Sequence, residues 1–220
     1  MSYFITGTDT GVGKTLISVA LLHGLAAQGK CVAGFKPVAA GGDADDINED
    51  VKQLLAASSP ALTVKQINPY YFPAAIAPHL AAEATKVQIE IECIVSAYQS
   101  LAATVDEVIV EGAGGFCVPL NDQHTTADLA KAINLPIVLV VGMRLGCLNH
   151  ALLTQQMIVA YGLNFVGWVA NEVTPCMPFL TENIQALKKR LDAPLLGVVP
   201  FQGQANAKIA ANYLDLGMLK

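Results

Sequence analysis

The sequence has few charged residues and no long apolar run, and these absences exclude several classes of protein. Only 14% of its 220 residues are charged, against about 25% in an ordinary soluble domain. The longest apolar run, residues 135–143, is far shorter than the roughly 20 residues of a membrane-spanning helix, and Arg144 follows it. The first residues include neither a basic segment nor an apolar stretch of signal-peptide length, so we expect a cytoplasmic protein.

Basic residues are also scarce. The chain has 13 lysines and arginines against 18 acidic residues, a net charge of −5, and its only arginines are Arg144 and Arg190. A surface that binds nucleic acid needs a cluster of cations, so a nucleic-acid partner is not expected. The low charge itself favours much buried surface, as in a fully covered sheet or a subunit interface.

The five cysteines offer neither a disulfide framework nor a metal site. Cys31, Cys93, Cys117, Cys147 and Cys176 are odd in number and widely spaced, with no C-x-x-C pair. We expect reduced thiols that lie mostly in the core.

Short β-branched runs alternate with longer helical patterns, which is typical of a parallel sheet covered by helices. The sequence predicts strands at 3–6, 31–35, 108–110, 136–141, 165–170 and 195–199, and helices at 15–27, 50–57, 91–105, 126–133, 149–161 and 179–191. Three prolines in residues 68–78 predict an irregular segment that wraps over the surface. The fold class expected is α/β, a single domain over residues 1–220 with a mostly parallel sheet and helices on both of its faces.

A phosphate-binding loop directly follows the first predicted strand. Residues 7–15 read GTDTGVGKT, which fits G-x-x-x-x-G-K-[ST] and leads into an apolar helical pattern. Such a loop turns backbone N–H groups toward phosphate oxygens at a helix N-terminus. Lys14 is expected to reach the β and γ phosphates, and the Thr15 hydroxyl is expected to bind Mg²⁺. The motif therefore predicts that the α/β domain is a single P-loop NTPase domain.

Two further strand ends carry charge. Glu111 ends an apolar strand and precedes Gly-Ala-Gly-Gly, so it is the candidate second ligand of Mg²⁺; the alternative is an acid that only caps a turn. Lys36, followed by Pro37, can stabilise negative charge on a phosphoryl group or a carboxylated substrate, or it is a solvated lysine. The acids Asp43, Asp45, Asp46 and Asp50 are a candidate carboxylate source for the ion, or a solvated loop.

Several motifs together carry a family resemblance. They are TGTDTGVGKT at 6–15, GFKPVA at 34–39, VEGAGG at 110–115, VVGMRLGCLNH at 140–150 and VANEV at 169–173. In this order and over this much of the chain, the sequence closely resembles dethiobiotin synthetase. The resemblance implies closure of the ureido ring of dethiobiotin from 7,8-diaminononanoate, CO₂ and MgATP, through a carbamate and a carbamic-phosphoric anhydride, with release of ADP and phosphate. It also implies a homodimer. The sequence shows no nucleophile motif, and this chemistry needs none.

The resemblance also implies roles for individual residues. Thr10, Lys14 and Lys36 are the catalytic candidates, and Thr15, Asp50 and Glu111 surround the metal. The implied ATP-binding residues are Gly11, Val12, Gly13, Lys14, Thr15, Leu16, Asp50, Glu111, Gly112, Ala113, Gly114, Asn171, Glu172, Pro200, Phe201 and Gln202. The implied substrate residues are Thr10, Lys36, Ala40, Cys147, Leu148 and Asn149. The last three bind the terminal carboxylate of the substrate, and in the family they are contributed by the other subunit of the homodimer.

The sequence departs from the better-known members at two of these positions. Gly11 stands where they carry a glutamate, and Ala40 where they carry a serine that contacts substrate. We expect altered affinity or nucleotide preference rather than loss of activity. Asp46 is an alternative to Asp50 as the aspartate beside the metal.

Other P-loop proteins are the alternatives. A switch ATPase of the ParA or MinD type carries a signature lysine just after the first P-loop glycine, where this chain has Thr8. A small-molecule kinase usually supplies arginines to the phosphates, and this chain has two in all. The amidation domain of the cobyrinic acid synthases is normally joined to a glutaminase domain, for which no chain remains.

Overall fold

The central sheet has six parallel strands. The computed structural model describes residues 2–42 and 47–219. In spatial order its strands are β2 (Val32–Phe35), β5 (Glu107–Glu111), β1 (Tyr3–Gly7), β6 (Ile137–Met143), β7 (Phe165–Glu172) and β8 (Leu195–Val199). All neighbouring pairs are parallel. The strands β5 and β6, which are rich in Val, Ile and Leu, are fully buried, as expected for a sheet covered on both faces. The predicted parallel sheet is confirmed.

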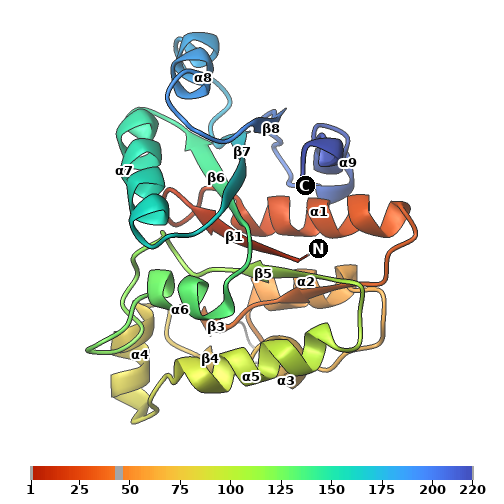
Figure 1. Ribbon diagram of the computed structural model, residues 1–220, viewed down its shortest axis with the longest axis vertical. Helices are drawn as coiled ribbons and strands as arrows, with labels where there is room; N and C mark the ends of the chain where they lie inside the picture. Colours follow the sequence, from red (N-terminus) through yellow and green to blue (C-terminus); the bar gives the residue numbers. More distant parts are fainter. Residues whose placement is uncertain (1, 43–46, 220) are drawn as a thin grey trace.

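Helices cover both faces of this sheet, as predicted. Alternate residues of β6 separate the two layers: Val138 and Val140 pack with the cluster beneath α1 (Lys14–Ala27), whereas Leu139 and Val141 pack with α7 (Cys147–Ala160) and α8 (Leu180–Lys188). On the first face α1 contacts α2 (Glu49–Ala57) and α9 (Ala207–Ala211), and Figure 1 shows α1 and α9 side by side. The sheet carries α5 (Ile91–Ala102) and α6 (Thr126–Ile133) as well, and the chain ends beyond η1 (Leu216–Met218).

The register brings the chemically important strand ends to one edge. Ile5 of β1 pairs with Glu111 of β5, and Gly7 pairs with Val140 of β6. Because all strands run in the same direction, the loops that follow them gather at this edge, which is where open α/β sheets bind ligands. β5 lies between β1 and β2, and Lys36, directly after β2, still reaches the cavity that the P-loop lines.

Residues 68–78 differ from the expectation of an irregular surface segment. Tyr70–Phe72 forms β4, which pairs in parallel with β3 (Val38–Ala40) in a small second sheet. The prolines at 69 and 73 only flank this strand, and short edge strands tolerate flanking prolines. Two short helices, α3 (Val64–Ile67) and α4 (Pro78–Thr85), were not predicted; Pro78 occupies the first turn of α4, where a missing N–H has no cost.

The cysteine expectation is confirmed in part. All five thiols are free, but only Cys147 is buried, and Cys93, Cys117 and Cys176 are exposed. The expectation that they lie mostly in the core is therefore wrong. The cores on the two faces are built instead around Val, Ile, Leu and large aromatic side chains such as Phe4 and Trp168. Among the described residues, no helix combines the length and the apolarity that crossing a bilayer requires.

Candidate functional site

The P-loop connects β1 to α1 in the geometry that the motif requires. Gly13 precedes α1 with a φ of 89°, and no side chain caps the helix, so backbone N–H groups of the first turn are free to bind an anion. A Cβ on Gly13 would also lie 2.2 Å from Nδ2 of Asn171. Glycine is therefore required at this position by both conformation and contact. Gly11 likewise has a positive φ of 72°.

Lys14 lies beneath this loop and is 7% exposed. Its Nζ donates to the backbone oxygen of Asp9 at 3.0 Å. Burial, and then the positive charge of Lys36, lower the pKa of Lys14 to about 8. The lysine that the motif assigns to phosphate is thus held by the loop itself in the absence of a phosphate group.

Four side chains from four elements meet beside the loop. Thr15 of α1 lies with its Oγ1 2.7 Å from Asp50 Oδ1 and 2.9 Å from Glu111 Oε1. Lys36, directly after β2, places Nζ 2.9 Å from Asp50 Oδ2 and 2.5 Å from Glu111 Oε1. Burial alone would lower the pKa of Lys36, but Glu111 and Asp50 outweigh it and raise that pKa. Burial would raise the pKa of Asp50, but Lys36 and Thr15 hold it below its usual value.

Asn48 positions Asp50. Its side chain caps α2 by accepting from the backbone N–H groups of Asp50 and Val51, and its Nδ2 donates to Gly41 O at 2.7 Å. Sequence reasoning did not assign Asn48 a role, although an asparagine two residues before a predicted helix residue is a helix-start signal. The alternative aspartate, Asp46, lies outside the described residues, as do Asp43 and Asp45.

The cluster fits a magnesium ion. Two carboxylates and a hydroxyl are hard oxygen ligands of the kind Mg²⁺ takes beside a phosphate. Glu111 is fully buried, and its Oε2 has no hydrogen-bond partner, which leaves an acceptor available to a cation. Within residues 2–42 and 47–219, no group of three or more His, Cys, Asp or Glu side chains could hold a metal ion, so a denser metal site is not found there.

A cavity of about 780 Å³ opens beside these residues. Its lining combines polar and charged side chains with apolar ones. The polar and charged ones are Thr10, Lys14, Thr15, Lys36, Asp50 and Glu111, and the apolar ones include Val38, Ala40, Ala75, Ile76, Pro78 and Val118. Of the described residues that line it, none is a cysteine, serine or histidine. The cavity can therefore bind and polarise a substrate but supplies no strong side-chain nucleophile.

The structure brings together some of the predicted residues and leaves others apart. Gly11, Gly13, Ala113 and Gly114 line the same cavity, and Gly112 O lies 3.4 Å from Lys36 Nζ. Val12 is fully buried under the loop, and Leu16 packs against the core. Val12, Leu16 and Gly112 adjoin the cavity's residues without lining it themselves. The other predicted residues that do not line it are Asn171, Glu172, Pro200, Phe201, Gln202, Cys147, Leu148 and Asn149.

The residues outside the cavity fall into two places. Asn171, 4% exposed, donates from Nδ2 to Val12 O at 2.9 Å, and Glu172 ends the same strand; residues 200–202 directly follow β8. Cys147, Leu148 and Asn149 form the first turn of α7, which begins two residues earlier than predicted because Gly146 adopts a φ of 96° before it. Asp9 pairs with Arg144, just after β6, a contact that the sequence did not predict.

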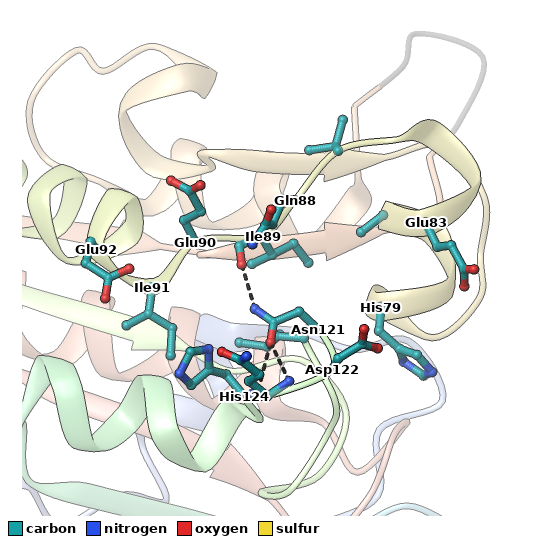
Figure 2. Close-up of a pocket in the computed structure, with 14 residues that line it drawn as sticks. His79, Glu83, Gln88, Ile89, Glu90, Ile91, Glu92, Asn121, Asp122 and His124 are labelled. Carbon is teal, nitrogen blue, oxygen red and sulfur yellow. Dashed lines mark hydrogen bonds between the residues drawn. The ribbon is translucent and has the colours of Figure 1, made fainter.

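A second hollow, of about 540 Å³, shares none of these residues. Figure 2 shows its side chains, among them His79, Glu83, Asp122 and His124. Asn121 joins two segments that line this hollow: its Nδ2 donates to Ile89 O at 2.9 Å, and its Oδ1 accepts from the N–H of His124 at 2.8 Å. The described residues that line it include no lysine or arginine, so it does not resemble a phosphate site.

Comparison with known sequences adds family evidence to this geometry. Residues 1–208 match a family model described as an AAA domain. The chain is 49% identical to the ATP-dependent dethiobiotin synthetase BioD of Aromatoleum aromaticum over 215 residues, which is 96% of both chains. It is 48% identical to the protein of the same name from Nitrosospira multiformis, over 99% of this chain and 96% of that one.

Solved structures share the fold at lower identity. The septum site-determining protein MinD from Pyrococcus horikoshii, complexed with Mg-ADP, matches with a TM-score of 0.58 and 18% identity over 100% of this chain and 89% of that chain. A ParA family ATPase from Chlorobium tepidum matches with a TM-score of 0.57 and 14% identity, over 99% and 92% of the two chains. These likenesses support the P-loop NTPase fold.

Proposed function

Because the chain belongs to the ATP-dependent dethiobiotin synthetase family, we propose that the P-loop cavity is where it closes the ureido ring of dethiobiotin. The protein is an ATP-dependent ligase of biotin biosynthesis. The proposed substrates are 7,8-diaminononanoate, CO₂ and ATP.

One observation carries this assignment. Two lysines and a phosphate loop line the same cavity as a set of apolar side chains. A substrate with reacting nitrogen atoms at one end and an alkyl chain at the other fits this mixed lining, with the alkyl chain against Val38, Ile76 and Val118. A phosphate-binding site for nucleotide alone would not require the apolar residues.

Each reaction step needs positioning and charge stabilisation. One substrate amine adds to CO₂ and loses a proton, which gives a carbamate that Thr10 and Lys36 are placed to hold. A carbamate oxygen attacks the γ-phosphorus, and ADP leaves. The second amine then attacks the carbonyl carbon of this anhydride and loses a proton as phosphate leaves. Lys14, Lys36 and the N–H groups of the P-loop stabilise the negative charge that develops on the transferred phosphoryl group.

Mg²⁺ is a proposed cofactor. Thr15, Asp50 and Glu111 would hold it, and its chemistry there is to neutralise charge on the nucleotide phosphates. The unpaired Glu111 Oε2 supports this proposal. Asn171, Glu172 and residues 200–202 are proposed to bind the adenine at the neighbouring strand ends.

A homodimer is proposed as the working form. The first turn of α7, a helix of 14 residues, contains Cys147, Leu148 and Asn149. These three residues do not line the cavity of their own chain. Cys147 N–H donates to Arg144 O at 3.0 Å, so the N–H groups of Leu148 and Asn149, presented to a partner's cavity, are the ones that suit the substrate carboxylate. The free thiols and the use of ATP favour a cytoplasmic location.

The alternative is a switch ATPase of the ParA or MinD type. Those proteins share the fold at 14–18% identity, which says nothing of activity. Thr8 stands where their signature lysine would be. The relatives at 46–49% identity are dethiobiotin synthetases.

The test is a ring-closure assay. The purified protein is given MgATP, 7,8-diaminononanoate and labelled bicarbonate, and ADP and labelled ring product are measured together. We expect ADP release to depend strongly on the diamine and to match the product one for one. ATP turnover that ignores the diamine, with no labelled product, would favour the switch ATPase instead.

Lys36→Gln makes the assay specific to this site. Gln keeps most of the volume of Lys36 but removes the charge that faces the carbamate and the phosphoryl group. Product formation should fall at least about a hundredfold, while nucleotide still binds in an equilibrium titration. Near-normal turnover of this variant would mean that Lys36 takes no part in the chemistry.

A further inference from the structure

The Lys36 ammonium group occupies the centre of the carboxylate cluster. Its Nζ lies 2.9 Å from Asp50 Oδ2 and 2.5 Å from Glu111 Oε1. A third contact, of 3.4 Å, joins Nζ to the carbonyl oxygen of Gly112. Lys36 is 4% exposed and Glu111 is fully buried. Burying two carboxylates is costly unless a positive charge compensates them. Lys36 provides that charge.

The Thr15 hydroxyl adds no positive charge to the cluster and satisfies only one of the two carboxylate oxygens that it contacts. Its Oγ1 approaches both Asp50 Oδ1 and Glu111 Oε1 within 2.9 Å, but a hydroxyl has only one proton to donate. Glu111 Oε1 is shared between this hydroxyl and Lys36, while Oε2 has no partner. The oxygens are therefore arranged for a cation that contacts all of them, and the lysine satisfies only part of the arrangement.

The ammonium and a divalent ion would compete for the same atoms. Mg²⁺ binds oxygen at about 2.1 Å, so an ion held by Thr15, Asp50 and Glu111 would lie against a lysine that is hydrogen-bonded to two of them. Two cations this close in a buried site repel each other strongly. Lys36 also lines the cavity of about 780 Å³, so its side chain has space to leave the carboxylates in the direction of the substrate.

We propose that Lys36 is the counter-ion of the metal-binding carboxylates Asp50 and Glu111 in the metal-free protein, and that entry of the metal with its nucleotide displaces it toward the reacting groups. This inference rests on the magnesium site of the proposed function. It gives Lys36 two successive positions: on Asp50 and Glu111 before the metal enters, and beside the phosphoryl group afterwards. The lysine thus becomes available for catalysis only when the metal and nucleotide are present.

The sharpest test measures metal binding without nucleotide. Mn²⁺ is the probe, and free Mn²⁺ is followed by electron paramagnetic resonance in titrations of the wild type and of Lys36→Met. Removing the resident cation leaves Asp50 and Glu111 uncompensated, so Lys36→Met should bind Mn²⁺ at least about tenfold more tightly. Unchanged or weaker binding would overturn the proposal. A structural or purely catalytic role for Lys36 predicts no such gain.

Matched variants separate contact from general charge. Lys30→Met removes a half-exposed lysine that pairs with Glu107 at 3.3 Å, and Mn²⁺ binding should not change. Lys14→Met removes a buried lysine that is held by the Asp9 carbonyl rather than by the cluster, so its gain should be clearly smaller than that of Lys36→Met. An equal gain would mean that only the overall field matters and would contradict the proposal. Lys36→Met/Asp50→Asn should lose the gain.

A measurement on the wild type protects the test against misfolding of the variant. Acetylation of Lys36 by acetic anhydride is followed by mass spectrometry at increasing Mn²⁺, with Lys30 as the internal reference. Lys36 should become more reactive as Mn²⁺ displaces it; unchanged reactivity at saturating Mn²⁺ would overturn the proposal. Failure of the ring-closure assay would leave these metal measurements intact, so the two proposals fail separately.

Discussion

Asn171 supports the P-loop, and it is also the residue that we propose to recognise the adenine base. Its Nδ2 donates to Val12 O at 2.9 Å, and it lies against Gly13. The hydrogen bond uses the amide nitrogen, which leaves Oδ1 free to accept from an adenine amino group. A side chain that only supported the loop would affect every nucleotide equally, whereas one that also read the base would affect ATP most.

Asn171→Ala should therefore weaken ATP binding more than GTP binding. Loss of a buried hydrogen bond costs about 1–3 kcal/mol, so we expect ATP affinity to fall roughly tenfold or more and the preference for ATP over GTP to shrink. Calorimetric titration with both nucleotides measures this. Asn164→Ala, on an exposed side chain just before the same strand, is the control. An equal loss for ATP and GTP would leave Asn171 with the supporting role alone.

Motif residues were predictable from the sequence, and pairings between distant strands were not. Thr15 and Glu111 follow from the P-loop and from an acid at a strand end, and the structure brings them within 2.9 Å. The ion pair of Asp9 with Arg144 joins loops 135 residues apart, and no local pattern predicts such a contact. The exposed cysteines were misplaced because burial of a small residue depends on the packing around it, which composition does not encode.

At the scale of elements, the N-terminus of α6 supports the loop that carries Val118 and Gly114 to the cavity. Thr126 Oγ1 donates to Phe116 O at 2.6 Å and accepts from the N–H of Val118. The helix is itself held by Asp128, whose Oδ2 accepts from the N–H and the hydroxyl of Thr125, both at 2.7 Å. This reciprocal cap fixes where the helix begins.

Asp128→Asn should destabilise the protein in a pH-dependent way. Burial would raise the pKa of Asp128, but the hydrogen bonds from Thr125, with a smaller effect of His124, hold it below the usual 3.8. A lowered folded-state pKa contributes stability above 3.8, and this stability is lost as the pH falls through the folded-state value. The variant should lose about 1 kcal/mol at pH 7.

Urea denaturation at pH 7 and near pH 3 measures the difference between wild type and variant. The difference should shrink at the lower pH, because the unfolded chain already binds a proton at Asp128 below the usual pKa of 3.8 and the stability that the lowered folded-state pKa contributes is then progressively lost. Asp122→Asn, at an exposed position in the preceding loop, should show no loss at either pH. A difference that does not change with pH would assign the effect to packing rather than to charge.

Elements with a clear local pattern were predicted well, and the shortest ones were not. The range of α6 and that of β8 agree with the prediction to the residue, because a helical apolar pattern and a short apolar run are local signals. β3, β4 and α3 contain three or four residues each, too few for a hydrophobic period to emerge. They form because neighbouring chain covers them, which is tertiary information.

At the scale of the whole molecule, the low charge of the sequence is only partly explained by the covered sheet. α7 buries Ala151 and Ile158 against the sheet, but its opposite face exposes Leu153 and Met157, and Leu145 just before it is 99% exposed. An exposed apolar cluster of this kind is typical of a surface that binds another protein. In the homodimer proposed above, a second copy of the chain would cover this face next to the proposed carboxylate-binding turn.

Leu153→Asp tests this interface. Leu153 is 58% exposed in the single chain, so a charge there has little effect on the folded subunit, whereas a charge facing its own symmetry copy in a dimer is strongly unfavourable. Sedimentation velocity should show a dimer for the wild type and a monomer for the variant, with similar circular dichroism. Ile209→Asp, at a similarly exposed residue on α9, should remain dimeric.

Because the first turn of α7 is proposed to complete the partner's site, the monomeric variant should also bind the diamine weakly while still binding ATP. A Leu153→Asp protein that stays dimeric, or a wild type that is monomeric at assay concentration, would contradict the interface and require the carboxylate to be bound within one chain.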